Sequence, residues 1–157
     1  MNDTSTAVAV TQPFAGLRRT YRAHISPTIE RATFTPLESS IRRRRATGTW
    51  KPPFDGLEVI RIGSSVLTDT VLQDFQGRKV RPATAEELFY HLREDPYVVL
   101  RRHAPLAALG SVTFVDGYRH VLVATRGKLG AGLLLHRYDG DWGSIYSYLV
   151  APILQAP

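Results

Sequence analysis

Ser111–Thr125 reads SVTFVDGYRHVLVAT, and this stretch decides the predicted fold. Two runs rich in β-branched and aromatic residues flank Asp116-Gly117, the dipeptide that most strongly favours a two-residue β-hairpin turn. That turn places Thr113 opposite His120 in an antiparallel pair. We then expect His120 on the less buried face, with Val115, Tyr118 and Leu122. The better core face is formed by Val112, Phe114, Val121 and Val123.

Further strands are expected on both sides of this hairpin. Turns at 126–128 and 139–141 separate three apolar runs, so the C-terminal third is predicted to be an antiparallel β-meander of about four strands. Residues 68–76 are predicted to be a helix that ends at Gly77, and residues 104–110 a short helical connector. The predicted strands are 57–62, 97–102, 111–115, 118–125, 130–138 and 143–151.

The best-specified helix is predicted over residues 84–94. Thr84 and Glu87 have the spacing of a capping box, in which each side chain accepts a hydrogen bond from the other residue's backbone N–H. Apolar residues follow at the spacing of one helical face, at Ala85, Leu88, Phe89 and Leu92. Helices followed by hairpin-linked strands indicate an α+β fold. We expect the meander, with one or two further strands, to pack on this capped helix.

The N-terminal third differs from the rest in composition. We interpret residues 1–13 as a disordered tail, 14–50 as a basic arm with two short helices, and 51–157 as a single α+β domain. The first helix is predicted by an apolar stripe from Phe14 to Ile25 that ends at Pro27. The second is predicted to begin at Thr35-Pro36-Leu37-Glu38, a helix-start signal, and to end at Gly48.

Positive charge is concentrated in that arm. The chain has a net charge of +6, and residues 1–50 carry eight arginines against three acidic residues, a net of +5. We therefore expect residues 14–48 to contact nucleic acid or an acidic protein partner. The arginines expected to make these contacts are Arg18, Arg19, Arg22, Arg42, Arg43, Arg44 and Arg45.

Several classes of function are excluded or disfavoured. The chain has no cysteine, which excludes a thiol nucleophile, a disulfide and a cysteine-ligated metal. Motifs for a phosphate-binding loop, a zinc protease or a serine hydrolase are missing. The histidines lack metal-ligand spacing, so we expect no metal and no cofactor. Without a long apolar run or a basic leader, no membrane span is expected, and the cytoplasm is the expected location.

Candidate catalytic residues lie on the predicted meander. His120 and His136 fall on neighbouring strands and could share a face, with Arg119, Arg137 and Tyr146 nearby. Histidine can act as general acid or base, and arginine can stabilise the charge that develops during phosphodiester cleavage. Trp142, Tyr146 and Tyr148 could instead stack on bases, although core packing is the favoured interpretation.

The sequence therefore favours a non-enzymatic binding protein whose basic arm contacts its partner. The alternative is a small metal-independent nuclease or phosphodiester-cleaving enzyme that uses the histidines, arginines and tyrosine of the sheet. A further alternative is an adaptor, immunity or structural protein–protein module.

Overall fold

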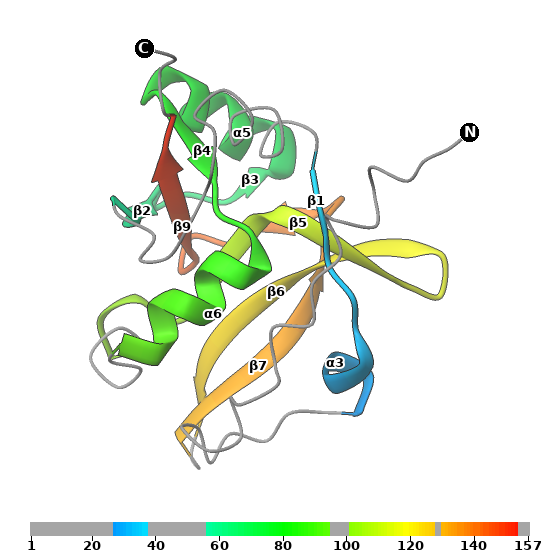
Figure 1. Cartoon of the computed structure of the whole chain (residues 1–157). Helices are drawn as coiled ribbons and strands as arrows, with labels where there is room; N and C mark the ends of the chain where they lie inside the picture. Colours follow the sequence, from blue (N-terminus) through cyan, green and yellow to red (C-terminus); the bar gives the residue numbers. More distant parts are fainter. Residues whose placement is uncertain (1–26, 38–55, 95–100, 128–129, 154–157) are drawn as a thin grey trace.

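The computed structural model describes residues 27–37, 56–94, 101–127 and 130–153, and it shows an α+β fold, as predicted (Figure 1). No helix in these ranges is long and apolar enough to cross a membrane. The helices are α3 (Pro27–Arg31), α5 (Thr68–Gly77) and α6 (Ala85–Glu94). The strands are β1 (Thr35–Pro36), β2 (Glu58–Arg61), β3 (Val66–Leu67), β4 (Val80–Pro82), β5 (Leu106–Val115), β6 (Tyr118–Gly127), β7 (Gly130–Arg137), β8 (Asp141–Trp142) and β9 (Ser147–Pro152).

The main sheet has the order β2-β9-β5-β6-β7, with β1 paired to β5 and β4 paired to β9. Strands β5 and β6 form the predicted hairpin, and Thr113 lies opposite His120, which confirms the predicted register. Asp116 and Gly117 have φ angles of 52° and 81°. A type I′ turn requires positive φ at both central residues, which explains why Asp-Gly is found here. The hairpin tip projects beyond the rest of the sheet in Figure 1.

The prediction of a fourth meander strand was wrong. Strands β5, β6 and β7 follow one another in antiparallel order, but β9 lies on the other side of β5 and runs parallel to it. Between β7 and β9 the chain forms β8, which pairs with β3 in a separate two-stranded sheet. The chain therefore leaves the main sheet after β7, and β9 rejoins that sheet between β2 and β5. A mixed sheet results.

Two local predictions before β5 were also wrong. The first half of β5 includes residues 106–110, predicted as a helical connector, and residues 101–103 are helical although a strand was predicted over 97–102. The stretch LAALG has good helix formers, but every one of these residues is buried in the sheet. Tertiary packing therefore overrides the local propensity. Residues 97–100 lie outside the described residues.

Both faces of the central strands are buried, so the predicted division into a core face and a less buried face holds only in part. Val112, Val121 and Val123 are buried as predicted, but Leu122 is buried as well. Val121 and Val123 belong to one apolar cluster with helix α5, and Leu122 and Ala124 belong to a second cluster with helix α6. Phe114, predicted in the core, is 66% exposed at the hairpin. A strand that is covered on both sides has a continuous apolar run, and alternation cannot indicate its buried face.

Helix α6 is joined to the sheet at its first turn. The Thr84 N–H donates to Glu87 Oε1 at 2.9 Å, and the Glu87 N–H donates to Thr84 Oγ1 at 3.2 Å, the two hydrogen bonds of a capping box. The Ala85 N–H donates to Ser111 Oγ at 2.7 Å. The buried Arg81 guanidinium forms a bidentate ion pair with Glu87, at 2.7 and 2.8 Å. The start of α6 is therefore held by β4 and by β5.

Strand β1 replaces the beginning of the second predicted arm helix. Thr35 and Pro36 pair with Val112 and Ser111 of β5, so the helix-start signal at residues 35–37 was misleading. The Leu37 N–H donates to the carbonyl oxygen of Gly110 at 2.8 Å, which favours the extended backbone over a helical turn. Phe34 and Ile29 are buried in the cluster under α6. The remainder of the predicted helix, residues 38–48, lies outside the described residues.

Candidate functional site

The predicted catalytic residues divide between the two faces of the sheet. His120 lies opposite Arg137 across the β6–β7 pair, whereas His136 lies opposite Val121, the residue that follows His120. Successive strand residues point to opposite faces, so the two histidines do not share one. The expectation of a common face was wrong. A cleavage site that uses one histidine as acid and the other as base is not assembled on this sheet.

One face of strands β6 and β7 carries Tyr118, His120 and Arg137, which we call the Tyr118 face. The Arg137 guanidinium lies over the Tyr118 ring, with Cζ at 3.9 Å from its centroid. His120 Nδ1 lies 2.9 Å from the carbonyl oxygen of Tyr118. A carbonyl oxygen only accepts, so Nδ1 carries the proton, and in the neutral ring Nε2 is left with its lone pair. Tyr118 remains 54% exposed.

On the opposite face, His136 and Tyr146 belong to an aromatic cluster. The His136 ring stacks on Trp142 at 4.0 Å between centroids, and Tyr146 meets Trp142 edge-on at 5.0 Å. The Trp142 indole N–H donates to Thr68 Oγ1 at 3.0 Å, and the Thr68 hydroxyl donates to the Tyr138 carbonyl oxygen. Trp142 is fully buried. This cluster therefore packs β8 against helix α5.

Tyr148 belongs to the same core, so neither it nor Trp142 can form the stacking platform considered from sequence. Its ring is buried against Phe75 and Trp142. Burial, with a smaller contribution from Tyr146, raises the pKa of the Tyr148 phenol to about 12. The phenol therefore stays protonated at neutral pH and cannot serve as a base.

The charge of Arg119 is neutralised by its surroundings. Its guanidinium donates to both carboxylate oxygens of Asp139, at 2.7 and 3.2 Å, and lies 4.6 Å from the centroid of the Tyr138 ring. Burial raises the pKa of the Tyr138 phenol, although the nearby Arg119 opposes that shift. Arg137 differs, because no acidic side chain in the described ranges pairs with it. Of these two arginines, only Arg137 keeps its charge available for an anion.

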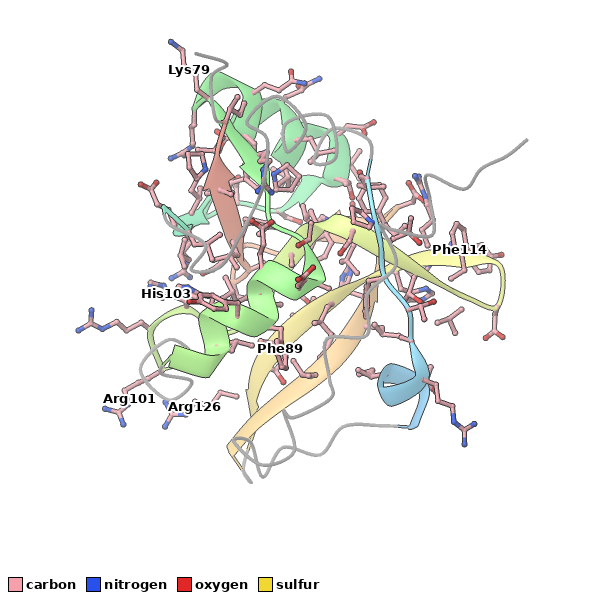
Figure 2. The ribbon with its side chains drawn as sticks, in the orientation of Figure 1. Lys79, Phe89, Arg101, His103, Phe114 and Arg126 are labelled. Atoms are coloured by element: carbon pink, nitrogen blue, oxygen red, sulfur yellow. The ribbon has the colours of Figure 1, made fainter. Side chains whose placement is uncertain are left out.

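A second set of cations lies at the opposite end of the sheet, and we call it the basic end: Arg101, Arg102, His103 and Arg126. Residues 101–103 form a helical turn just before β5. Leu106 pairs with Ala124, and the same antiparallel register brings that turn to the level of Arg126. Figure 2 shows Arg101, His103 and Arg126 at this end and Phe114 at the other. The three arginines are exposed, and none makes an ion pair within the described ranges.

Sequence reasoning did not select the basic end. The signal was the run Arg101-Arg102-His103, of which the two arginines were predicted to end a strand over residues 97–102. A helical turn beside the end of β6 changes that geometry and gathers the cations. The arginines predicted to bind a partner, Arg18, Arg19, Arg22 and Arg42 to Arg45, lie outside the described residues.

The structure predicts that stability falls at mildly acidic pH through His91. Burial on helix α6 and, to a smaller extent, the nearby His103 lower the pKa of His91 below 6.5. The unfolded chain therefore binds this proton more tightly than the folded protein. The stability of the fold with neutral His91 is fully present above about pH 6.5. It is lost as the pH falls from 6.5 through the lower pKa of His91 in the folded protein.

The measurement is urea unfolding of the wild type and His91→Gln between pH 7.5 and 5. The unfolding midpoint should fall more steeply with acid in the wild type. His103→Gln should retain most of that dependence, since burial is the larger cause. Identical pH profiles for the wild type and His91→Gln would contradict the assignment.

Comparisons with known proteins give no indication of function for this chain. The chain matches no protein-family model, and no curated protein or solved structure is significantly similar to it. Within the described residues, no three histidine or acidic side chains are grouped as a metal site would require.

Proposed function

We propose that this protein binds nucleic acid, and that the basic end contacts the phosphate backbone. The observation that carries the proposal is the set of three exposed arginines without an acidic partner in the described ranges, Arg101, Arg102 and Arg126. An unpaired surface guanidinium keeps its full charge and its fork of donors for phosphate oxygens. His103, beside them, adds a further donor.

The ion pairs elsewhere on the molecule strengthen this contrast. Arg78 pairs with Asp74 at 2.7 Å, and Arg119 pairs with Asp139 at the same distance. Among the described residues, these ion pairs thus neutralise arginines away from the basic end, and none neutralises Arg101, Arg102 or Arg126. The excess charge of residues 1–50 has the same sign and would add to the attraction of a polyanion.

The triple variant Arg101→Gln/Arg102→Gln/Arg126→Gln should weaken nucleic-acid binding and its salt dependence. Each phosphate contact releases condensed counterions, with a slope of log K against log salt of about −0.9 per contact for duplex DNA and about −0.7 for a single strand. Loss of three contacts should reduce the slope by about 2 to 3. Fluorescence anisotropy from low to physiological salt measures it.

Arg78→Gln is the matched control, because Asp74 already neutralises that arginine. It should leave both the affinity and the slope close to wild type. If the wild-type protein retains neither DNA nor RNA at low salt, the proposal fails. An equal loss in the control would show a general effect of net charge and would also contradict a specific basic end.

The same samples test the two other functions considered from sequence. Denaturing gels of the incubated RNA would reveal cleavage, and loss of that cleavage in His120→Ala would favour the phosphodiesterase alternative. Binding of an acidic protein with no retention of nucleic acid would favour a protein-interaction module instead.

A further inference from the structure

We infer that the Tyr118 face is a subsite for one unpaired nucleotide, with the base stacked on the Tyr118 ring and a phosphate held by Arg137. This inference rests on the proposed nucleic-acid binding and specifies its substrate class as single-stranded. It concerns the end of the sheet opposite to the basic end.

The geometry of the Tyr118 ring supports the stacking position. Arg137 covers one side of the ring, with Cζ at 3.9 Å from the centroid, and yet the residue remains 54% exposed. The guanidinium covers one side of the ring, and the exposed fraction leaves room for a base to stack on the other side. Every base has a π face that can stack on such a ring. A cation on the far side of the aromatic ring does not obstruct that stack.

The charges of this face complement a phosphate group. His120 and Arg137 are directly opposite across the β6–β7 pair, a separation at which their side chains can reach one ligand. Arg137 has no acidic partner in the described ranges, because the Asp139 carboxylate is occupied by Arg119 on the other face. The His120 ring is oriented by its hydrogen bond to the Tyr118 carbonyl oxygen. The Arg137 guanidinium is therefore positioned beside the ring to donate to a phosphate, and the hydrogen bond fixes the His120 ring next to it.

The stacking position selects unpaired nucleotides. In a duplex both faces of each base are covered by its neighbours, whereas a single strand can turn one base onto a protein ring. The basic end contacts only phosphates, which both forms present. Affinity for the two forms should therefore respond differently to changes at the two ends of the sheet.

Fluorescence anisotropy with labelled 20-nucleotide single strands, and with duplexes of the same length, tests the inference. Base–aromatic stacking contributes about 1–3 kcal/mol, so Tyr118→Ala should weaken single-strand binding roughly 5- to 150-fold. Duplex binding should change by less than about twofold. Tyr118→Phe keeps the ring and should restore near wild-type affinity, which a role that depends on the hydroxyl group would not predict.

Phe114→Ala is the matched control on the same hairpin. Phe114 is also exposed, but its cross-strand partner is Arg119, so it lies on the opposite face from Tyr118. This variant should leave single-strand binding unchanged. Thermal unfolding of all three variants should match the wild type, since both rings are exposed.

The outcomes separate this inference from the proposed function. Absence of nucleic-acid retention by the wild type overturns both. Retention that depends on Arg101, Arg102 and Arg126 but not on Tyr118 overturns the nucleotide subsite alone. Equal losses for single strand and duplex in Tyr118→Ala, or competition by an acidic peptide but not by free oligonucleotide, would likewise reject a stacked base.

Discussion

Glu87→Ala is expected to lower the free energy of unfolding by about 3–5 kcal/mol, the usual cost of leaving one charge of a buried ion pair uncompensated. Arg81 and Glu87 are 6% and 1% exposed, and their bidentate contacts are 2.7 and 2.8 Å long. Glu87 also accepts the Thr84 N–H at the start of α6. The substitution therefore removes the partner of a buried cation and the cap of a helix.

Urea unfolding followed by circular dichroism measures this change, and Asp74→Ala is the control. Asp74 pairs with Arg78 at the same 2.7 Å, but on an exposed helix surface. Solvent screening limits such a pair to about 0.3–0.5 kcal/mol. The double variant Arg81→Met/Glu87→Leu should recover much of the lost stability, because no buried charge remains. A Glu87→Ala loss no larger than that of Asp74→Ala would contradict the buried-pair interpretation.

Gly110→Ala is expected to lower the free energy of unfolding by about 3 kcal/mol or more. Overpacking a core usually costs about 1–3 kcal/mol, and the cost is highest where the added atom meets backbone that cannot move aside. A Cβ at this position would lie 2.5 Å from the carbonyl oxygen of Pro82 and 2.6 Å from that of Ala83. Neither oxygen can rotate away as a side chain would. The Gly110 N–H donates to that Ala83 oxygen at 2.7 Å, so any separation also weakens a buried hydrogen bond.

Gly110 lies where several strands meet, so this clash would disturb contacts throughout the main sheet. Here β5 changes its neighbour from β9 to β1, and Ala83 joins the separated strands by donating to Leu149 at 3.0 Å. Gly77→Ala is the control, since a Cβ there meets nothing within 4 Å. That helical substitution should stabilise by about 0.5–1 kcal/mol. A Gly110→Ala unfolding midpoint at or above the Gly77→Ala value would contradict the close-approach argument.

Glu87 and Gly110 show that the sequence predicts local contacts but not contacts between distant segments. Glu87 was selected for its spacing from Thr84, and that hydrogen bond is present, but nothing in the spacing indicated Arg81 as a buried partner. Gly110 was expected to end a connector, as glycine often does after a helical turn. Its real role depends on Pro82 and Ala83, which are adjacent only in the folded chain.

The candidate binding surfaces follow the same division. The register across Asp116-Gly117 placed Thr113 opposite His120 from sequence alone, because a two-residue turn leaves one antiparallel pairing. The sequence could not show which face of the central strands is covered, because α5 packs on one face and α6 on the other. The pairing of His136 with Val121 depended on where β7 joined β6.

The sequence by itself therefore determined the α+β class, the β5–β6 hairpin and the charge excess, because these depend on residues a few positions apart or on composition. Only the tertiary structure decided that β9 inserts beside β5, that His120 and His136 face opposite ways, and that Arg101, Arg102 and Arg126 gather at one end. These features arise from contacts between distant segments. Local propensity carries no information about which distant segments meet in the folded chain.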